Sequence, residues 1–206
     1  LIGLGAYFIV FSSAPLTPTI LVFLSGIIFL NILGVGKVSS LLTTILAITV
    51  ISLMVLAGFS IPYWDIGHFE PLYTSGISGL AGATALVFVS FAGVTKVAAI
   101  AEEVKDPAKN LPRGILLSLL LVTILYCVVS LMLSGVFDSS EIAGNLKPIY
   151  MLAHKVGGYA LAVAISVVAV ITMVNSTNAS VLAGSRFPFA MSRDNLLPKA
   201  LGSLKN

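Results

Sequence analysis

Long apolar stretches separated by short polar segments run along the whole chain. A helix that crosses about 30 Å of hydrocarbon needs about 20 apolar residues, because each residue advances it about 1.5 Å. The first stretch is too short to cross alone, whereas the others approach or exceed this length. Residues 185–194 alternate charge with apolar bulk, which predicts a short interfacial segment. The pattern predicts transmembrane helices at residues 1–13 (partial), 17–33, 40–59, 76–103, 114–137 and 151–183.

The composition agrees with a membrane protein. Of the 206 residues, 58% are hydrophobic and 9% are charged, against about 45–50% apolar and about 25% charged in soluble domains. We therefore predict an all-α, polytopic membrane helix bundle that forms part of a single transmembrane domain over residues 1–206. The net charge of +3 comes from a few basic residues in loops, so it does not indicate nucleic acid. The single cysteine, Cys127, excludes an intrachain disulfide and marks no metal site.

The basic residues predict the orientation of the helices. Alternate loops form two sets, and the positive-inside rule places the set richer in Lys and Arg in the cytoplasm. The poorer set holds only Lys147 and Lys155 and is expected outside. The richer set holds Lys37, Lys105, Lys109, Arg113, Arg186, Arg193, Lys199 and Lys205.

The predicted helix at 76–103 has a weak point at mid-membrane depth, at Ser90-Phe91-Ala92-Gly93. Gly93 lowers helix propensity by about 1 kcal/mol relative to Ala, and the β-branched Val94 and Thr95 follow it. Unwound backbone inside a membrane is tolerated only where it is buried in protein or lines a cavity. A discontinuity at about 90–93 would therefore be a ligand site. The alternative is that the two phenylalanines pack at helical spacing and Gly93 makes a close helix contact.

Several motifs occur in an order that resembles one transporter family. Phe88-Val-Ser-Phe91-Ala-Gly93, followed by Ala101-Glu-Glu-Val-Lys-Asp-Pro107, resembles the sixth-helix signature of the amino acid, polyamine and organocation (APC) superfamily. Asn31 to Gly34 is similar to its loop into helix five, and Ser185 to Pro198 to its segment after helix eight. The resemblance runs from late helix three to just past helix eight. The chain is therefore expected to be an incomplete fragment of a permease, without helices one, two and nine onward.

The resemblance implies an inverted-repeat transporter fold in which helices one and six are broken and line the substrate site. Half-helix N-termini attract a carboxylate, and unwound carbonyls accept from an ammonium group, so an amino acid suits such a site. The implied function is secondary active transport of amino acids by alternating access, as a symporter or antiporter. The implied substrate-binding residues are Phe88, Ser90, Phe91, Ala92, Gly93 and Val94.

A polar cluster interrupts the last apolar span. Such clusters usually face the interior of a helix bundle, and their hydroxyl and amide oxygens are suitable ligands for a hard cation. Coupling to Na⁺ or H⁺ is a possibility that the resemblance raises, while no cofactor and no metal are expected. Alternatively, these side chains bond back to helix carbonyls or bridge two helices. The candidate ion or polar site comprises Asn175, Ser176, Thr177, Asn178 and Ser180.

Charged residues near the cytoplasmic ends of the helices form a candidate gate: Lys96, Glu102, Glu103 and Arg186. Lys96 is the only charge well inside a span, and the alternative is that it snorkels toward the cytoplasm and pairs with a glutamate. A solvated turn is the alternative for the two acids. Glu102 and Glu103 lie at the end of a predicted span and no acid lies deep inside one, which argues against a basic substrate.

Two other functions are compatible with parts of the sequence. A carrier of cations or other organocations would keep the same fold and change the cargo. An intramembrane enzyme would need an activated nucleophile, paired carboxylates or metal ligands at membrane depth, and the spans hold no His, Asp or Glu deep enough. The expected partners are an amino acid, the lipid bilayer and the missing helices of the parent chain, without nucleic acid. The expected location is the plasma or cell membrane, as a multi-pass protein.

Overall fold

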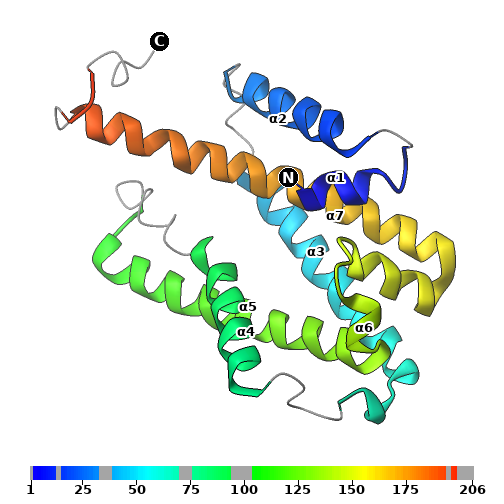
Figure 1. The fold of residues 1–206 in the computed structure, drawn as a ribbon. Coiled ribbons are helices and arrows are strands. Elements are labelled where there is room, and N and C mark those ends of the chain that lie inside the picture. The colour runs from blue at the N-terminus through cyan, green and yellow to red at the C-terminus, as the bar shows by residue number, and fades with distance from the viewer. Residues whose placement is uncertain are drawn as a thin grey trace. The chain divides into compact units, whose positions relative to one another are not determined.

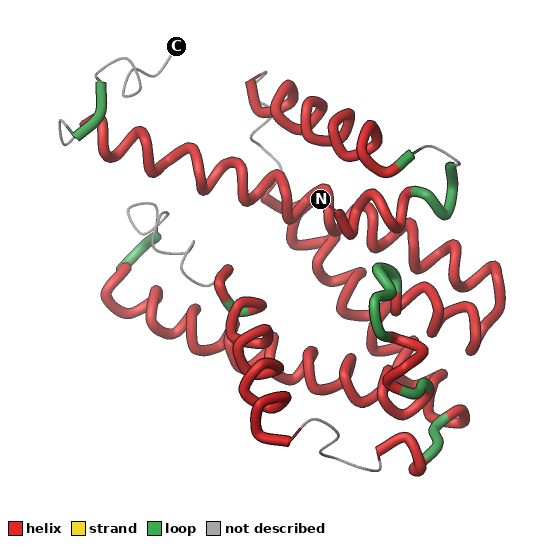
Figure 2. The backbone as a smooth tube through the Cα atoms, viewed as in Figure 1, coloured by secondary structure: helices red, strands yellow, loops and turns green. Residues whose placement is uncertain are grey.

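The computed structural model describes residues 2–12, 15–32, 39–69, 76–93, 104–193 and 196–198. Within these ranges all regular structure is helical (Figure 2), which confirms the predicted all-α class. The inverted-repeat relation stays a prediction. The helices, labelled in Figure 1, are α1 (Ile2–Phe8), α2 (Leu16–Ile32), α3 (Ser39–Ser60), α4 (Gly76–Ser90), α5 (Pro107–Val136), α6 (Ser139–Ile142) and α7 (Pro148–Arg193), with the 3-10 helices η1 (Ile61–Tyr63) and η2 (Ile66–Phe69) after α3.

Three helical stretches of the described chain are long and apolar enough to cross a membrane. They cover Thr43–Tyr63, Pro107–Val136 and Pro148–Ser185. Two shorter apolar helices cover Thr17–Phe29 and Gly76–Ser90. Their order along the chain follows the apolar pattern of the sequence.

The chain divides into two compact units, of which the first comprises residues 1–74 and 123–177. Its core lies where α3, the end of α5 and the first part of α7 meet. Met132 and Leu152 are completely buried there. Partly buried apolar side chains surround this cluster, so the three helices share one hydrophobic core. Its members are Leu56, Met132, Val136, Phe137, Leu152, Ala153, Ala162 and Ile165.

Helix α5 starts earlier than the expected span at 114–137. The structure is helical from Pro107 onward. Proline is favourable at the first helical position, where its missing N–H is not needed. Asp106 adopts a positive φ of 47° just before this start, and the side chain of Asn110 donates to the carbonyl of Lys105 at 2.6 Å. Pro112 is tolerated inside the helix.

Helix α7 differs from the expected span at 151–183 in two ways. Gly158 has φ 70° and ψ −167° and is not helical, so residues 148–157 form a separate short helix before the long one. This backbone region is essentially restricted to glycine. At the other end, residues 185–193, expected as a separate interfacial segment, continue α7 with Pro188 inside it.

Candidate substrate site

The predicted discontinuity coincides with the end of α4. This helix ends at Ser90, Phe91 lies in a turn, and Ala92 and Gly93 form a 3-10 turn. The amide of Phe91 donates to the carbonyl of Phe88 at 3.1 Å, a bond to the third residue back that tightens the last turn. The Ser90 hydroxyl donates to the carbonyl of Leu86 at 3.1 Å.

The α4 end is open to its surroundings. No residue of α4 is buried, and the Phe88 side chain is 79% exposed. A Cβ added at Gly93 would meet nothing within 4 Å. The described structure therefore contains no close helix contact at Gly93, which was the alternative explanation for this glycine. Its φ also lies outside the positive range, so its conformation here does not require glycine.

Part of the predicted site lies outside the described residues. This applies to Val94 and to the candidate gate residues Lys96, Glu102 and Glu103. The backbone of Arg186 belongs to α7. The role of the gate residues stays a prediction.

The polar cluster lies on α7, in a part of the helix without a break. The hydroxyl of Thr177 bonds back to the carbonyl of Met173 at 2.8 Å, as the alternative interpretation expects. Ser176, Asn178 and Ser180 also have interaction partners. The side-chain oxygen Oδ1 of Asn175 is buried without a hydrogen-bond partner in the described structure. Such buried polar atoms are rare and call for a ligand, ion or water.

A polar contact between helices lies one turn before this cluster. The hydroxyls of Thr49 on α3 and Thr172 on α7 are 2.6 Å apart, and each also contacts the carbonyl four residues back at 2.8 Å. The sequence pattern does not single out this pair. Thr172 lies three residues before Asn175, so the two share one side of a helix, but the identity of the partner on α3 depends on how the helices pack.

Comparison with known proteins identifies a family and several relatives. The family model described as amino acid permease matches residues 3–206. The branched-chain amino acid permease BcaP of Bacillus subtilis (strain 168) is 32% identical over 183 residues, which cover 89% of this chain and 39% of that protein. BcaP of Lactococcus lactis subsp. cremoris (strain MG1363) is 31% identical over 183 residues, 86% of this chain and 39% of the relative. The methylthioribose transporter of Bacillus subtilis (strain 168) is 36% identical over 154 residues, 75% of this chain and 33% of the relative.

The chain thus spans less than half the length of these curated relatives. The matches lie along most of this chain, so the similarity is not limited to one motif. All three relatives are transporters by name, and none is named as an enzyme.

Proposed function

The chain belongs to the amino acid permease family, and from this premise we propose that it forms part of a longer secondary transporter that carries an amino acid by alternating access. The protein is a transporter rather than an enzyme, and it is a multi-pass integral protein of the cell membrane. The match to only 39% of each BcaP supports the view that further helices complete the transporter.

The observation that carries the proposal is the end of an apolar helix at Ser90, at the position where the family resemblance implies a broken helix. The last carbonyls of a helix carry the negative end of the helix dipole, and each has two lone pairs, so the Phe88 carbonyl that accepts from the Phe91 amide can accept a second donor. These carbonyls therefore suit the ammonium group of an amino acid. Phe88 and Phe91 lie at the same helix end and offer apolar surface for a side chain.

We propose a neutral aliphatic amino acid as the substrate. Two relatives are named as branched-chain amino acid permeases. No acid lies deep inside the predicted spans to pair with a cationic side chain. The methylthioribose transporter shows by its name that a relative can carry a different cargo. A carrier of cations or other organocations is the second candidate.

The substrate class is tested by uptake of labelled leucine into proteoliposomes that contain the full-length protein. Competition by valine and isoleucine, with little competition by lysine or methylthioribose, is the expected result. Competition by lysine or by an organic cation, without any effect of the aliphatic amino acids, would refute the substrate proposal.

The role of the α4 end is tested by Gly93→Val in the same protein. A Cβ at Gly93 has open space around it, so we expect the variant to insert and stay monodisperse. Its added side chain would occupy space next to the main chain that the substrate needs, so uptake should be abolished. Gly82→Val is the matched control, because it lies on α4 and also meets nothing within 4 Å. Equal uptake by both variants would place the binding site elsewhere.

We further propose that the chain couples transport to Na⁺ or H⁺, and that the polar cluster on α7 is the site if the ion is Na⁺. The buried, unpartnered Oδ1 of Asn175 supports a Na⁺ site, whereas the amides and hydroxyls of the cluster do not take up a proton near neutral pH. Leucine uptake driven by an imposed Na⁺ gradient, compared with uptake driven by a pH gradient, distinguishes the two ions. Uptake that follows only the pH gradient would refute the cluster as the ion site, and uptake that follows neither gradient would refute ion coupling.

A further inference from the structure

The short helix at the start of α7, residues 148–157, forms most of the lining of a pocket of about 510 Å³ in the first unit. Phe137, the residue directly after α5, completes the lining. We call this pocket the lysine pocket. Its residues are Phe137, Tyr150, Met151, His154 and Lys155.

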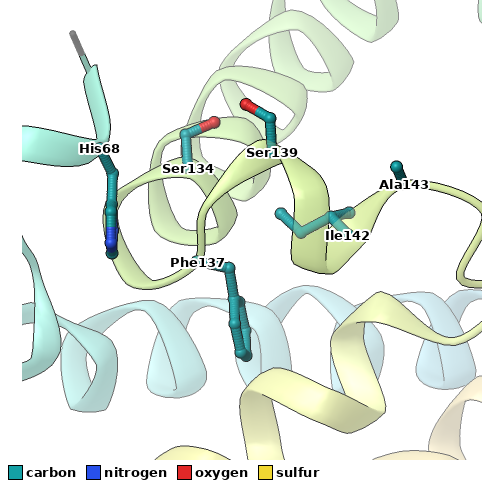
Figure 3. Close-up of a pocket in the computed structure, with 6 residues that line it drawn as sticks. All are labelled: His68, Ser134, Phe137, Ser139, Ile142 and Ala143. Atoms are coloured by element: carbon teal, nitrogen blue, oxygen red, sulfur yellow. The ribbon is translucent and has the colours of Figure 1, made fainter.

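Phe137 also lines a second pocket, which contains His68 and is drawn in Figure 3. In this view the Phe137 ring points away from the hydroxyls of Ser134 and Ser139. The ammonium nitrogen of Lys155 lies over the same ring, 4.5 Å from its centre. The ring therefore belongs to the surroundings of Lys155 and not to those of the two serines.

Two ammonium groups lie over aromatic rings of the lysine pocket. Besides Lys155 over Phe137, the Nζ of Lys147 lies 5.3 Å from the centre of the Tyr150 ring. A cation within about 6 Å of a ring centre is attracted by the face of the ring. The two rings thus hold two positive charges next to one pocket.

Both charges can still bind an anion. In the described parts of the chain, neither Lys147 nor Lys155 forms an ion pair with a carboxylate. Lys155 donates to the carbonyl of Val136 at 2.8 Å, which uses one of its three N–H donors. Its side chain is exposed, as is that of His154. Lys155 can therefore donate to a ligand without releasing the end of α5.

The negative groups of this region do not cancel these charges. The negative dipole end of α5 is compensated by the ammonium of Lys155. Asp138 and Glu141 belong to the connection between α5 and α6, which lines the second pocket, and neither acid lines the lysine pocket. The lining of the lysine pocket holds a lysine and a histidine but no carboxylate, so its charge favours an anion.

The apolar part of the lining indicates what kind of anion fits. Phe137 and Met151 offer an anion in water nothing to bind, whereas an acyl chain can pack on them. The pocket lies before Gly158, where the long apolar part of α7 begins, and at the end of α7 that is expected to face outside. This is the depth at which the headgroups of phospholipids lie.

We propose that the lysine pocket binds the phosphate group of an anionic phospholipid. The phosphate oxygens would accept from Lys155 and from a ring N–H of His154, as charge-assisted hydrogen bonds, and Lys147 would add a second positive charge. Phosphatidylcholine has the same phosphate but also a quaternary ammonium group, which the two lysines repel. The site should therefore select phosphatidylglycerol. It does not depend on the proposed substrate site.

The first arm of the test measures lipid selection by the full-length protein. The protein is placed in nanodiscs with equal amounts of phosphatidylglycerol and phosphatidylcholine, and native mass spectrometry records which lipid stays bound. We expect preferential retention of phosphatidylglycerol. Lys147→Met and Lys155→Met should each lower this preference about fivefold, the effect of one lysine near an anionic lipid surface.

Two further variants control the first arm. Lys109→Met removes an exposed lysine from the other end of α5, outside the pocket, and should leave the preference unchanged. Lys155→Arg keeps the charge and should also keep the preference. Lys147 makes no side-chain hydrogen bond in the described structure, so Lys147→Met tests the site even where Lys155→Met fails to insert.

The second arm tests whether the phosphate belongs to a lipid or to a free ion. The retained lipid is challenged with excess inorganic phosphate and, at equal ionic strength, with chloride. We expect phosphate to release no more phosphatidylglycerol than chloride does. The proposal is overturned if phosphate releases clearly more, if phosphatidylcholine is retained equally well, or if Lys147→Met and Lys155→Met behave like Lys109→Met.

Discussion

The last turn of α5 and the last turn of α4 are both helix ends, but their surroundings differ. At the α5 end, Met132 and Val136 are fully buried, and the carbonyls of Gly135 and Val136 accept from Asp65 and Lys155. At the α4 end, the Ser90 hydroxyl and the Phe91 amide bond back to the preceding turn, and Ser90, Phe91 and Ala92 have further interaction partners. Phe88 is 79% exposed.

The difference separates a structural helix end from a candidate functional one. Neighbouring segments that cap an end also fix its position, as the segment after α3 does for α5. An end with an exposed phenylalanine, Phe88, and open space at Gly93 leaves room for a ligand or for helices outside this chain. Substitutions at the α5 end should therefore change stability, and those at the α4 end should change transport.

The largest effect on stability is expected from Gly135→Val. Even the Cβ would stand 2.9 and 3.0 Å from two atoms of the Trp64 ring, and the ring is held by its hydrogen bond to Ser60. Overpacking of this kind destabilises by about 1–3 kcal/mol, occasionally more. Thermal unfolding of the full-length protein in detergent should show the loss.

Gly114→Val on the same helix is the control for this prediction, because a Cβ there meets nothing within 4 Å. Two variants with the same unfolding temperature would mean that the contact between Trp64 and Gly135 does not hold the segment after α3 on α5.

The sequence predicted the helical class and the approximate positions of most helices, because long apolar runs are a strong signal in a membrane protein. The weak point at Ser90 to Gly93 was also readable, and α4 ends there. Low helix propensity and the family resemblance both predict a break at this position, but only the family resemblance predicts that a substrate binds there. That role stays a prediction, as does the role of Val94 and of the gate residues.

Other features depend on tertiary contacts that a local pattern does not contain. The docking of Trp64 and His68 against Gly135 joins residues far apart in the chain, and so does the contact between Thr49 and Thr172. The pair Gly157-Gly158 is a local indication of the break at Gly158, but an apolar run of that length favours one continuous helix. Whether the helix breaks or continues there is decided by packing against the rest of the protein.

A smaller effect on stability is expected from Gly158→Ala. The backbone there has φ 70° and ψ −167°, and a residue with a Cβ pays about 1–3 kcal/mol in such a region. No neighbour would clash with the added methyl group, so the strain is the whole effect. Gly184→Ala, at a helical position of α7 with open space, should be neutral or slightly stabilising. If Gly158→Ala melts like Gly184→Ala, residues 148–157 are not a separate helix in the folded protein.

The smallest effect on stability is expected from Phe88→Ala. This variant tests most directly whether the α4 end, unlike the α5 end, serves transport and not stability. The side chain is 79% exposed and belongs to a helix without buried residues, so its removal should change the free energy of unfolding by no more than about 0.5 kcal/mol. If the α4 end binds the substrate, the same change removes apolar surface from the site, and leucine should show a higher KM while the melting curve stays the same. Phe59→Ala, which removes another exposed aromatic ring (61% exposed) from α3, should alter neither quantity. A lower melting temperature with unchanged KM for Phe88→Ala would reverse the assignment, because the α4 end would then be a packing surface and not the place where the substrate binds.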